Sequence, residues 1–87
     1  MTLSEKVEYN QYAITQCEKA NQKLAKTHPG FSLVKRVYTQ GGRSGHEFAI
    51  THVDLHDRNW ICSGIDDTLE EGKAGIDRAI KRALSQI

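Results

Sequence analysis

Residues 31–53 read FSLVKRVYTQGGRSGHEFAITHV, and this stretch decides the fold of the 87-residue chain. Its two ends, residues 31–39 and residues 46–53, are rich in β-branched and aromatic side chains, which favour strands. Between them, residues 40–45 (QGGRSG) contain three glycines. Two such runs around a short glycine-containing segment are typical of a β-hairpin. We therefore expect two antiparallel strands joined by a flexible loop.

The first predicted strand alternates imperfectly between apolar and polar side chains. One of its faces carries Phe31, Leu33 and Val37. The opposite face mixes apolar and polar side chains: Ser32, Val34, Arg36 and Tyr38. Since both faces hold apolar residues, the sequence leaves open which face of the sheet is exposed.

A third strand and two helices complete the expected fold. Residues 56–59 indicate a turn, and residues 60–63 (WICS) a short third strand. Residues 3–27 contain neither glycine nor proline, and their apolar residues recur at steps of three and four, which predicts a long amphipathic helix. Ser4 is the expected N-cap, and Pro29 disfavours helical geometry in the residue before it.

The first helix supports two interpretations. In one, its apolar stripe faces the core of the same chain; the stripe consists of Leu3, Val7, Ile14, Cys17 and Leu24, widened by Ala13 and Ala20. In the other, Asn10 and Asn21 lie on a seam spaced in sevens, and such polar positions can set the register of a coiled-coil dimer. A homodimer through the first helix therefore remains open.

The last segment of the chain predicts a second helix. Thr68 followed by Glu71 forms a capping box, and the acidic residues at its start suit the helix dipole: Asp66, Asp67 and Glu70. Its apolar stripe consists of Leu69, Ile76, Ile80, Ala83 and Ile87. Gly72 and Gly75 allow a close approach to the sheet, because they lack side chains.

Together these elements predict a single α+β domain over residues 1–87 with the order α-β-β-β-α. Both helices should pack on one face of a three-stranded antiparallel sheet, because such a sheet can keep its other face in water. The exposed face would then be free for contact with a partner.

Composition narrows the functional classes. The net charge is +1, and no segment has the basic excess expected of a protein held to phosphates mainly by charge. No run of apolar residues is long enough to span a bilayer, and the first ten residues lack the apolar core of a signal peptide, which favours a cytoplasmic location. Cys17 and Cys62 are expected to be buried packing residues without a disulfide.

Residues 51–56, THVDLH, raise the question of a metal site. In an extended strand His52, Asp54 and His56 would point the same way, and catalytic zinc commonly has three such ligands. The turn at residues 57–59 follows at once, so the alternation should be lost before His56. We therefore expect no metal and no cofactor here, but the polar end of an ordinary strand.

The sequence also predicts a non-enzymatic protein. His46 and Glu47 are adjacent in a strand, so their side chains should point to opposite faces and not meet. No nucleophile elbow of the form G-x-S-x-G is present, and Cys17 lies on a helix stripe rather than beside a base. No catalytic residue is assigned.

Residues 28–87 resemble the double-stranded RNA-binding domain family. Phe31 matches the aromatic residue at the start of that family's first strand, and Gly45-His46 partly matches its Gly-Pro-x-His loop. Further matches are apolar residues in the second strand and last helix: Phe48, Ala79, Ala83 and Leu84. The resemblance implies the α-β-β-β-α topology.

At one functional position the chain differs from this family. The family grips phosphates with lysines at the start of its last helix, where this chain reads Leu69-Glu70-Glu71-Gly72-Lys73. Two glutamates at that position would repel phosphates. The family's usual RNA-binding surface is therefore not expected.

Two functional hypotheses follow. The first is a small protein-binding module, a regulator or inhibitor of the kind that mobile genetic elements encode, with contacts from the exposed sheet face and the hairpin loop. Its contact residues would be Arg36, Tyr38, Arg43 and Trp60. The second is binding to double-stranded RNA or DNA through basic residues around the hairpin: Lys35, Arg36, Arg43, His46 and Arg58.

Overall fold

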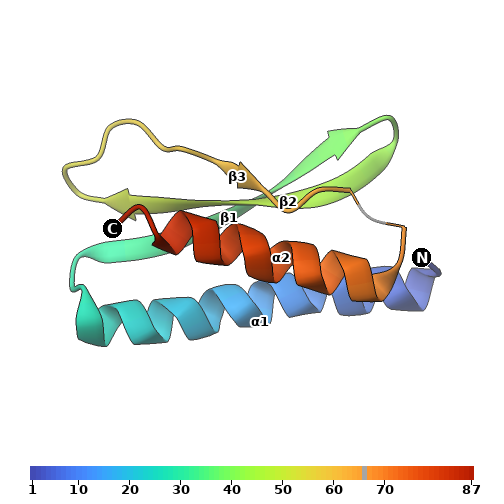
Figure 1. The fold of residues 1–87 in the computed structure, drawn as a ribbon, viewed down its shortest axis with the longest axis horizontal. Coiled ribbons are helices and arrows are strands. Elements are labelled where there is room, and N and C mark those ends of the chain that lie inside the picture. The colour runs from blue at the N-terminus through green and yellow to red at the C-terminus, as the bar shows by residue number, and fades with distance from the viewer. Residues whose placement is uncertain (66) are drawn as a thin grey trace.

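A computed structural model describes residues 1–65 and 67–87 of the chain. Its elements are α1 (Leu3–Thr27), β1 (Phe31–Gln40), β2 (Arg43–His52), β3 (Ile61–Cys62) and α2 (Leu69–Leu84). The three strands form an antiparallel sheet in the order β1-β2-β3. Figure 1 shows both helices on the same side of this sheet, with the opposite face uncovered. The predicted α+β fold is confirmed.

The hairpin turn is tighter than predicted. β1 and β2 stay paired from Phe31 with His52 to Gln40 with Arg43, so Gly41 and Gly42 alone connect the strands. Their φ angles of 59° and 76° lie in the left-handed region that a two-residue type I′ turn requires. The prediction of a flexible loop over residues 40–45 was therefore wrong. Two adjacent glycines close the turn because they adopt positive φ without steric cost.

The predicted bounds of α1 are confirmed, but its N-cap differs. Thr2 caps the helix: its Oγ1 accepts a hydrogen bond from Glu5 N at 3.2 Å, while Thr2 N donates to Glu5 Oε1 at 3.0 Å. This reciprocal pair is a complete capping box. Ser4, the predicted cap, lies inside the first turn because the box forms two residues earlier.

The buried face of α1 matches the predicted stripe only in part. The buried residues are Tyr9, Ala13 and Leu24, of which Ala13 and Leu24 were predicted and Tyr9 was not. Leu3, Val7 and Ile14 are exposed by 80%, 63% and 39%. The cause is that α1 packs on α2 as well as on β1, which turns a different side of the helix inward.

Gly72 of α2 makes room for this arrangement. A Cβ atom at Gly72 would lie 2.8 Å from the Tyr9 ring, closer than carbon atoms can pack. The glycine thus permits the close approach that its sequence position indicated, although the neighbour is α1 rather than the sheet.

The predicted start of α2 is confirmed at Thr68, whose Oγ1 accepts from Glu71 N at 3.2 Å. Its buried side includes three residues of the predicted stripe: Ile76, Ile80 and Ala83. Ile87 lies beyond the helix end and is 39% exposed, so its assignment to the stripe was wrong. Asp66, expected to contribute charge at this helix start, lies outside the described residues.

Candidate interaction surface

The strand register settles which side chains share the open face. Leu33 pairs with Ile50, and both are buried on the side of the helices. Because side chains alternate along a strand, even-numbered residues of β1 and odd-numbered residues of β2 face the other way. On this open face lie Ser32, Val34, Arg36, Tyr38 and Gln40 with Gly45, Glu47, Ala49 and Thr51. At the strand end, the side chain of Arg43 instead reaches Asp67 before α2.

Arg36 is held between two partners on the open face. Its guanidinium carbon lies 4.0 Å from the ring centroid of Trp60, and its Nε donates to Glu47 Oε2. The cation–π contact and the ion pair fix the plane of the guanidinium. The side chain nevertheless remains 53% exposed. A cation that is positioned but still accessible can bind a partner with little loss of conformational entropy.

Glu47 connects Arg36 to β3. The hydrogen bond from Arg36, together with a weaker one from Cys62, lowers the pKa of the Glu47 carboxyl. The carboxylate is therefore ionised at neutral pH and keeps the ion pair intact. Glu47 was not among the predicted contact residues. A two-residue turn at Gly41-Gly42 would have revealed it, because that turn places Arg36 opposite Glu47.

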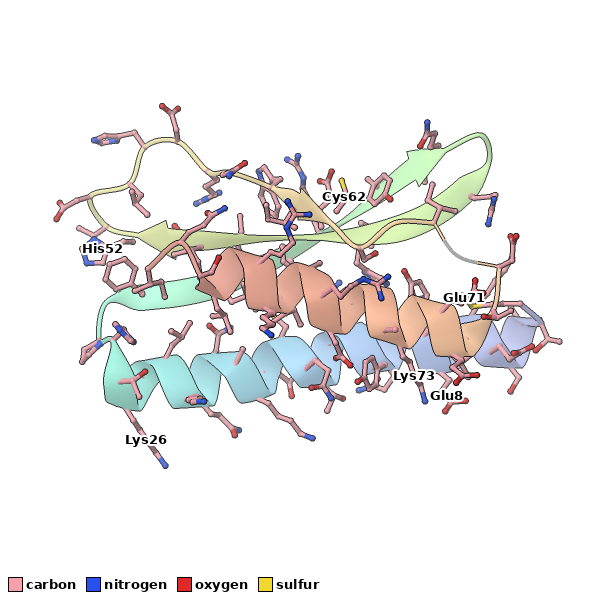
Figure 2. The ribbon with its side chains drawn as sticks, in the orientation of Figure 1. Glu8, Lys26, His52, Cys62, Glu71 and Lys73 are labelled. Carbon is pink, nitrogen blue, oxygen red and sulfur yellow. The ribbon has the colours of Figure 1, made fainter. Side chains whose placement is uncertain are left out.

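Cys62 is exposed on the open face, so the prediction that it is buried was wrong. Its Sγ donates to Glu47 Oε1 at 3.3 Å, and Figure 2 shows the side chain on the side of the sheet away from the helices. Partial burial and the adjacent Glu47 carboxylate raise the pKa of the Cys62 thiol. The thiol is thus mostly protonated and a weak nucleophile. Burial likewise raises the pKa of Cys17, and both cysteines are free.

Tyr38 lies over the backbone of Gly45 near the hairpin. A Cβ atom at Gly45 would be 2.7 Å from Tyr38 Cε1 and 2.8 Å from the carbonyl oxygen of Gly64. An aromatic ring above a strand glycine shields the bare backbone from water. Tyr38 is therefore fixed as the second aromatic side chain of the open face, beside the Arg36–Trp60 pair.

His46, by contrast, lies on the helix side and is only 2% exposed. Its Nε2 is 3.0 Å from Asn10 Oδ1, and its ring centroid is 4.9 Å from that of Tyr9. Burial, assisted by the charge of Lys35, lowers the pKa of His46 to about 4, so the ring is neutral at pH 7. A side chain this enclosed cannot reach a partner without local unfolding, and we leave it out of the proposed surface.

The remaining predicted basic residues do not gather into one patch. Arg43 is bonded to the Asp67 carboxylate and lies 3.4 Å from the carbonyl oxygen of Ile65. Lys35 is half-buried on the helix side of β1, and Arg58 is exposed in the loop between β2 and β3. The basic residues that were predicted to form one nucleic-acid-binding cluster thus lie on two faces of the sheet and in a loop.

Of the two histidines in residues 51–56, His52 ends β2 and His56 lies beyond it. The ring of His52 lies 4.5 Å from that of Phe31, and its Nδ1 accepts from Asp54 N at 3.2 Å. Within residues 1–65 and 67–87, no three or more His, Cys, Asp or Glu side chains are grouped so that they could hold a metal ion. His56 follows in the exposed loop, separated from His52 by the turn.

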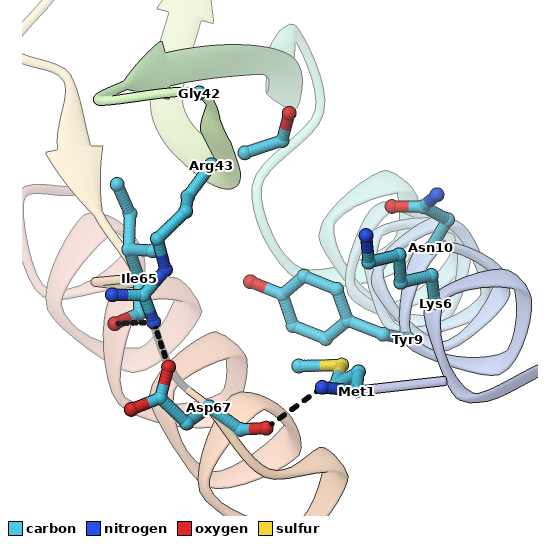
Figure 3. A pocket seen from close by; sticks show the side chains of 9 residues that line it. Met1, Lys6, Tyr9, Asn10, Gly42, Arg43, Ile65 and Asp67 are labelled. Atoms are coloured by element: carbon cyan, nitrogen blue, oxygen red, sulfur yellow. Dashed lines mark hydrogen bonds and ion pairs between the residues drawn. The ribbon is translucent and has the colours of Figure 1, made fainter. Parts of the chain in front are cut away.

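A cavity of about 320 Å³ lies at the hairpin end of the molecule (Figure 3). It forms where α1, the hairpin and the segment before α2 meet, and its polar lining includes Lys6, Tyr9, Asn10, Arg43, Ser44 and Asp67. Because Asp67 binds Arg43, the two charges largely neutralise each other at the rim. The sequence carries no signal for this cavity, since three distant segments build it.

No protein-family model matches the chain, and no curated protein or solved structure is similar to it. The relation to the double-stranded RNA-binding domain family therefore stays a prediction from sequence. None of the helices in the described part of the chain has the length and apolar character needed to cross a membrane.

Proposed function

We propose that this chain is a small protein-binding module that acts through one patch of the open sheet face, which consists of Arg36, Tyr38, Glu47, Trp60 and Cys62. The observation that carries the proposal is the Arg36 guanidinium, stacked on Trp60 and bonded to Glu47 yet 53% exposed. Arginine, tryptophan and tyrosine are the side chains that most often dominate protein interfaces.

Prior ordering of these side chains supports the proposal further. Side chains that a partner must immobilise cost about 0.5–1.5 kcal/mol each on binding. Arg36 is already restrained by Trp60 and Glu47, and Tyr38 by Gly45. A partner presenting neutral hydrogen-bond acceptors, such as backbone carbonyl groups, and an apolar edge would meet a prepared site on this face.

Binding of duplex RNA or DNA through Lys35, Arg36, Arg43, His46 and Arg58 is the alternative. Phosphate binding depends on cations that are free to displace counterions. Arg36 and Arg43 are engaged with carboxylates, and His46 is buried with a lowered pKa. These contacts favour a protein partner over a nucleic acid.

A regulator or inhibitor, of the kind that mobile genetic elements encode and active in the cytoplasm, suits these features better than an enzyme. The thiol of Cys62 has a raised pKa, and the neutral ring of His46 is enclosed by the helices. Neither group is poised to attack or to exchange protons with a bound substrate.

Affinity purification with matched variants tests the proposal. Tagged wild type, Arg36→Ala and Arg78→Ala are each incubated with lysate of the source organism, and recovered proteins are quantified by mass spectrometry. Arg78 is an exposed arginine on α2, away from the open face, and serves as the control. A protein recovered by wild type and Arg78→Ala should fall roughly tenfold with Arg36→Ala, as for an interface hot spot.

A gel-shift assay tests the alternative directly. Wild type and Arg58→Ala are titrated with duplex RNA, duplex DNA and single strands at about 50 and 200 mM salt. No salt-dependent shift is expected at micromolar protein. A shift that weakens steeply with salt and depends on Arg58 would overturn the protein-binding proposal.

A further inference from the structure

β1 forms one edge of the sheet, and among the described residues no strand lies along its outer side. The strand order β1-β2-β3 gives it a strand neighbour on one side only. It extends over ten residues, from Phe31 to Gln40. An edge of this length offers a row of backbone N–H and C=O groups with which another strand can pair.

Asn21 of α1 closes this edge at Leu33. Its Nδ2 donates to Leu33 O at 2.9 Å, and its Oδ1 accepts from Leu33 N at 2.7 Å, as the backbone of a neighbouring strand would. The Leu33 N–H therefore points away from β2. Because the antiparallel ladder alternates, the N–H and C=O groups of Lys35, Val37 and Thr39 point away from β2 as well.

The rest of this edge is open. In the part of the chain that the structure describes, no side chain caps Lys35, Val37 and Thr39 as Asn21 caps Leu33. Val37 is 55% exposed although it faces the helix side of the sheet. An apolar side chain and unpaired backbone groups thus lie together on the second half of β1.

The flank of α1 next to this open edge is apolar too. Val7, Ile14 and Asn21 are spaced by seven residues, about two helical turns, so they share one flank of the helix. The contact of Asn21 with Leu33 places that flank beside β1. Along it Val7 and Ile14 are 63% and 39% exposed.

The open edge and the apolar flank border the same space. Val37 pairs with His46, whose Nε2 contacts Asn10 Oδ1 at 3.0 Å. Asn10 precedes Ile14 by one helical turn. The exposed side chain of Val37 therefore lies near the stretch of α1 that carries Ile14.

We propose that two copies of this chain pair through β1, antiparallel and about a two-fold axis at Val37, to form one continuous sheet. Lys35, Val37 and Thr39 of one copy then bond Thr39, Val37 and Lys35 of the other, and each pair exchanges both backbone hydrogen bonds. The two α1 flanks meet below the joined strands and cover each other's Ile14 and Val7.

The side chains of β1 select a second copy and this register. An axis at Arg36 or Lys35 would place like charges opposite each other, which is unfavourable in a sheet. An axis at Val37 places Val37 against itself, Lys35 against Thr39 and Arg36 against Tyr38, a favourable cation–π pair. The surface is thus complementary to itself, as a two-fold interface requires.

This dimer differs from a coiled coil along α1. The asparagines that would set a coiled-coil register are engaged within the chain, Asn10 with His46 and Asn21 with Leu33. In the proposed dimer α1 contributes only its flank, and the strand edge supplies the directional contacts.

Sedimentation velocity of the full chain tests the proposal. Wild type, Val37→Lys and the control Val53→Lys are compared between about 1 and 200 μM, where symmetric dimers of moderate affinity assemble. Val53 is 82% exposed in the loop after β2, so it tests the effect of an added charge alone. We expect a dimer for wild type and Val53→Lys, and at least roughly tenfold weaker association for Val37→Lys.

A second variant distinguishes a loss of dimerisation from a loss of folding. The Val37 N–H points away from β2, so Val37→Pro removes an outward donor and leaves the ladder with β2 intact. Circular dichroism verifies that both variants remain folded, and Val37→Pro should also weaken the dimer. A monomeric wild type over the whole range, or a folded Val37→Pro that dimerises as tightly as wild type, overturns the proposal.

The proposed dimer and the proposed partner-binding face can fail separately. Val37, which tests the dimer, faces the helix side, and Arg36, which tests partner binding, faces the open side; in the dimer Arg36 contributes only its contact with Tyr38 of the second copy. A monomeric wild type whose recovery of a partner depends on Arg36 would remove the dimer and leave the protein-binding function.

Discussion

The two faces of the sheet are built from the same strands, but the contacts on one face bury side chains in the core and the contacts on the other only hold exposed side chains in place. The helix-covered face buries Leu33, Phe48 and Ile50, which are exposed by 2%, 0% and 4%. The open face instead orders side chains that water still reaches, such as Arg36 over Trp60. Stability should therefore depend mainly on one face and partner contact on the other, which substitutions can separate.

The largest loss of stability is expected from the covered face. Phe48→Ala removes the largest fully buried side chain of the core and should lower the free energy of unfolding by about 3–5 kcal/mol. Urea denaturation measures the change. Phe31→Ala is the control, because Phe31 is only half-buried at the start of β1 and should cost clearly less. Equal losses from the two variants would contradict the assignment of the core.

His46 makes the covered face sensitive to acid. The pKa of His46 is lowered in the folded chain to about 4 from an ordinary 6.5, so the unfolded chain binds more protons between these pH values. The stability that the neutral His46 ring gives the folded chain is fully present above pH 6.5. As the pH falls toward 4, the free energy of unfolding should decrease by an amount on the order of 2–3 kcal/mol.

Urea denaturation at a series of pH values between 4 and 7 measures this dependence. His46→Gln should flatten the curve, and His56→Gln, in the exposed loop after β2, is the control substitution. A slope that persists in His46→Gln would assign the acid sensitivity to other groups.

A substitution of Asn21 tests how much its hydrogen bonds to the edge strand β1 stabilise the fold. Asn21→Ala removes both hydrogen bonds to the backbone of Leu33 and should cost about 1–2 kcal/mol. The neighbouring Gln22 is exposed, so Gln22→Ala should change stability by less than about 0.5 kcal/mol. Hydrogen exchange should locate the Asn21→Ala effect at the Leu33 amide; an effect spread evenly over the chain would contradict a local cap.

The smallest effect on stability is expected from the open face. Arg36→Ala breaks an exposed ion pair and a cation–π contact, so it should cost only about 0.5–1 kcal/mol. Thermal denaturation measures this cost. A loss as large as that of Phe48→Ala would show that Arg36 holds the fold together and would remove the contrast between the two faces.

Local sequence signals predicted most of the fold. The absence of glycine and proline over residues 3–27 and the Thr68 cap gave the two helices close to their observed bounds. These features depend on neighbours in sequence, so composition and spacing suffice to find them. The hairpin was found for the same reason, although the length of its turn was not.

The buried side of α1 could not be predicted from its own spacing. Leu3, Val7 and Ile14 of the predicted stripe are exposed, whereas Tyr9, which lay outside the stripe, is buried beside Ala13. The choice depends on α2, where Gly72 leaves room for the Tyr9 ring. The buried side of α1 thus depends on packing between segments far apart in the chain. The spacing of apolar residues within one helix carries no information about that packing.

The candidate site was predicted in part. Arg36, Tyr38 and Trp60 were proposed as contact residues from their types, and the structure brings them onto one face. Glu47 and the exposure of Cys62 were missed because they depend on strand register. Assigning Gly41-Gly42 as a two-residue turn fixes the β1–β2 register and would have placed Glu47 opposite Arg36. The face of Cys62 depends on the pairing of β2 with β3, which that turn does not set.

Site-specific photo-crosslinking tests most directly whether the open face is the contact surface. Benzoylphenylalanine replaces Cys62, beside Glu47 on the open face, or Gln22, on the outer side of α1. After irradiation in cells of the source organism, the protein-binding account predicts a discrete protein adduct from position 62 and none from position 22. Adducts from position 22 alone, or nucleic acid as the material crosslinked at position 62, would contradict it.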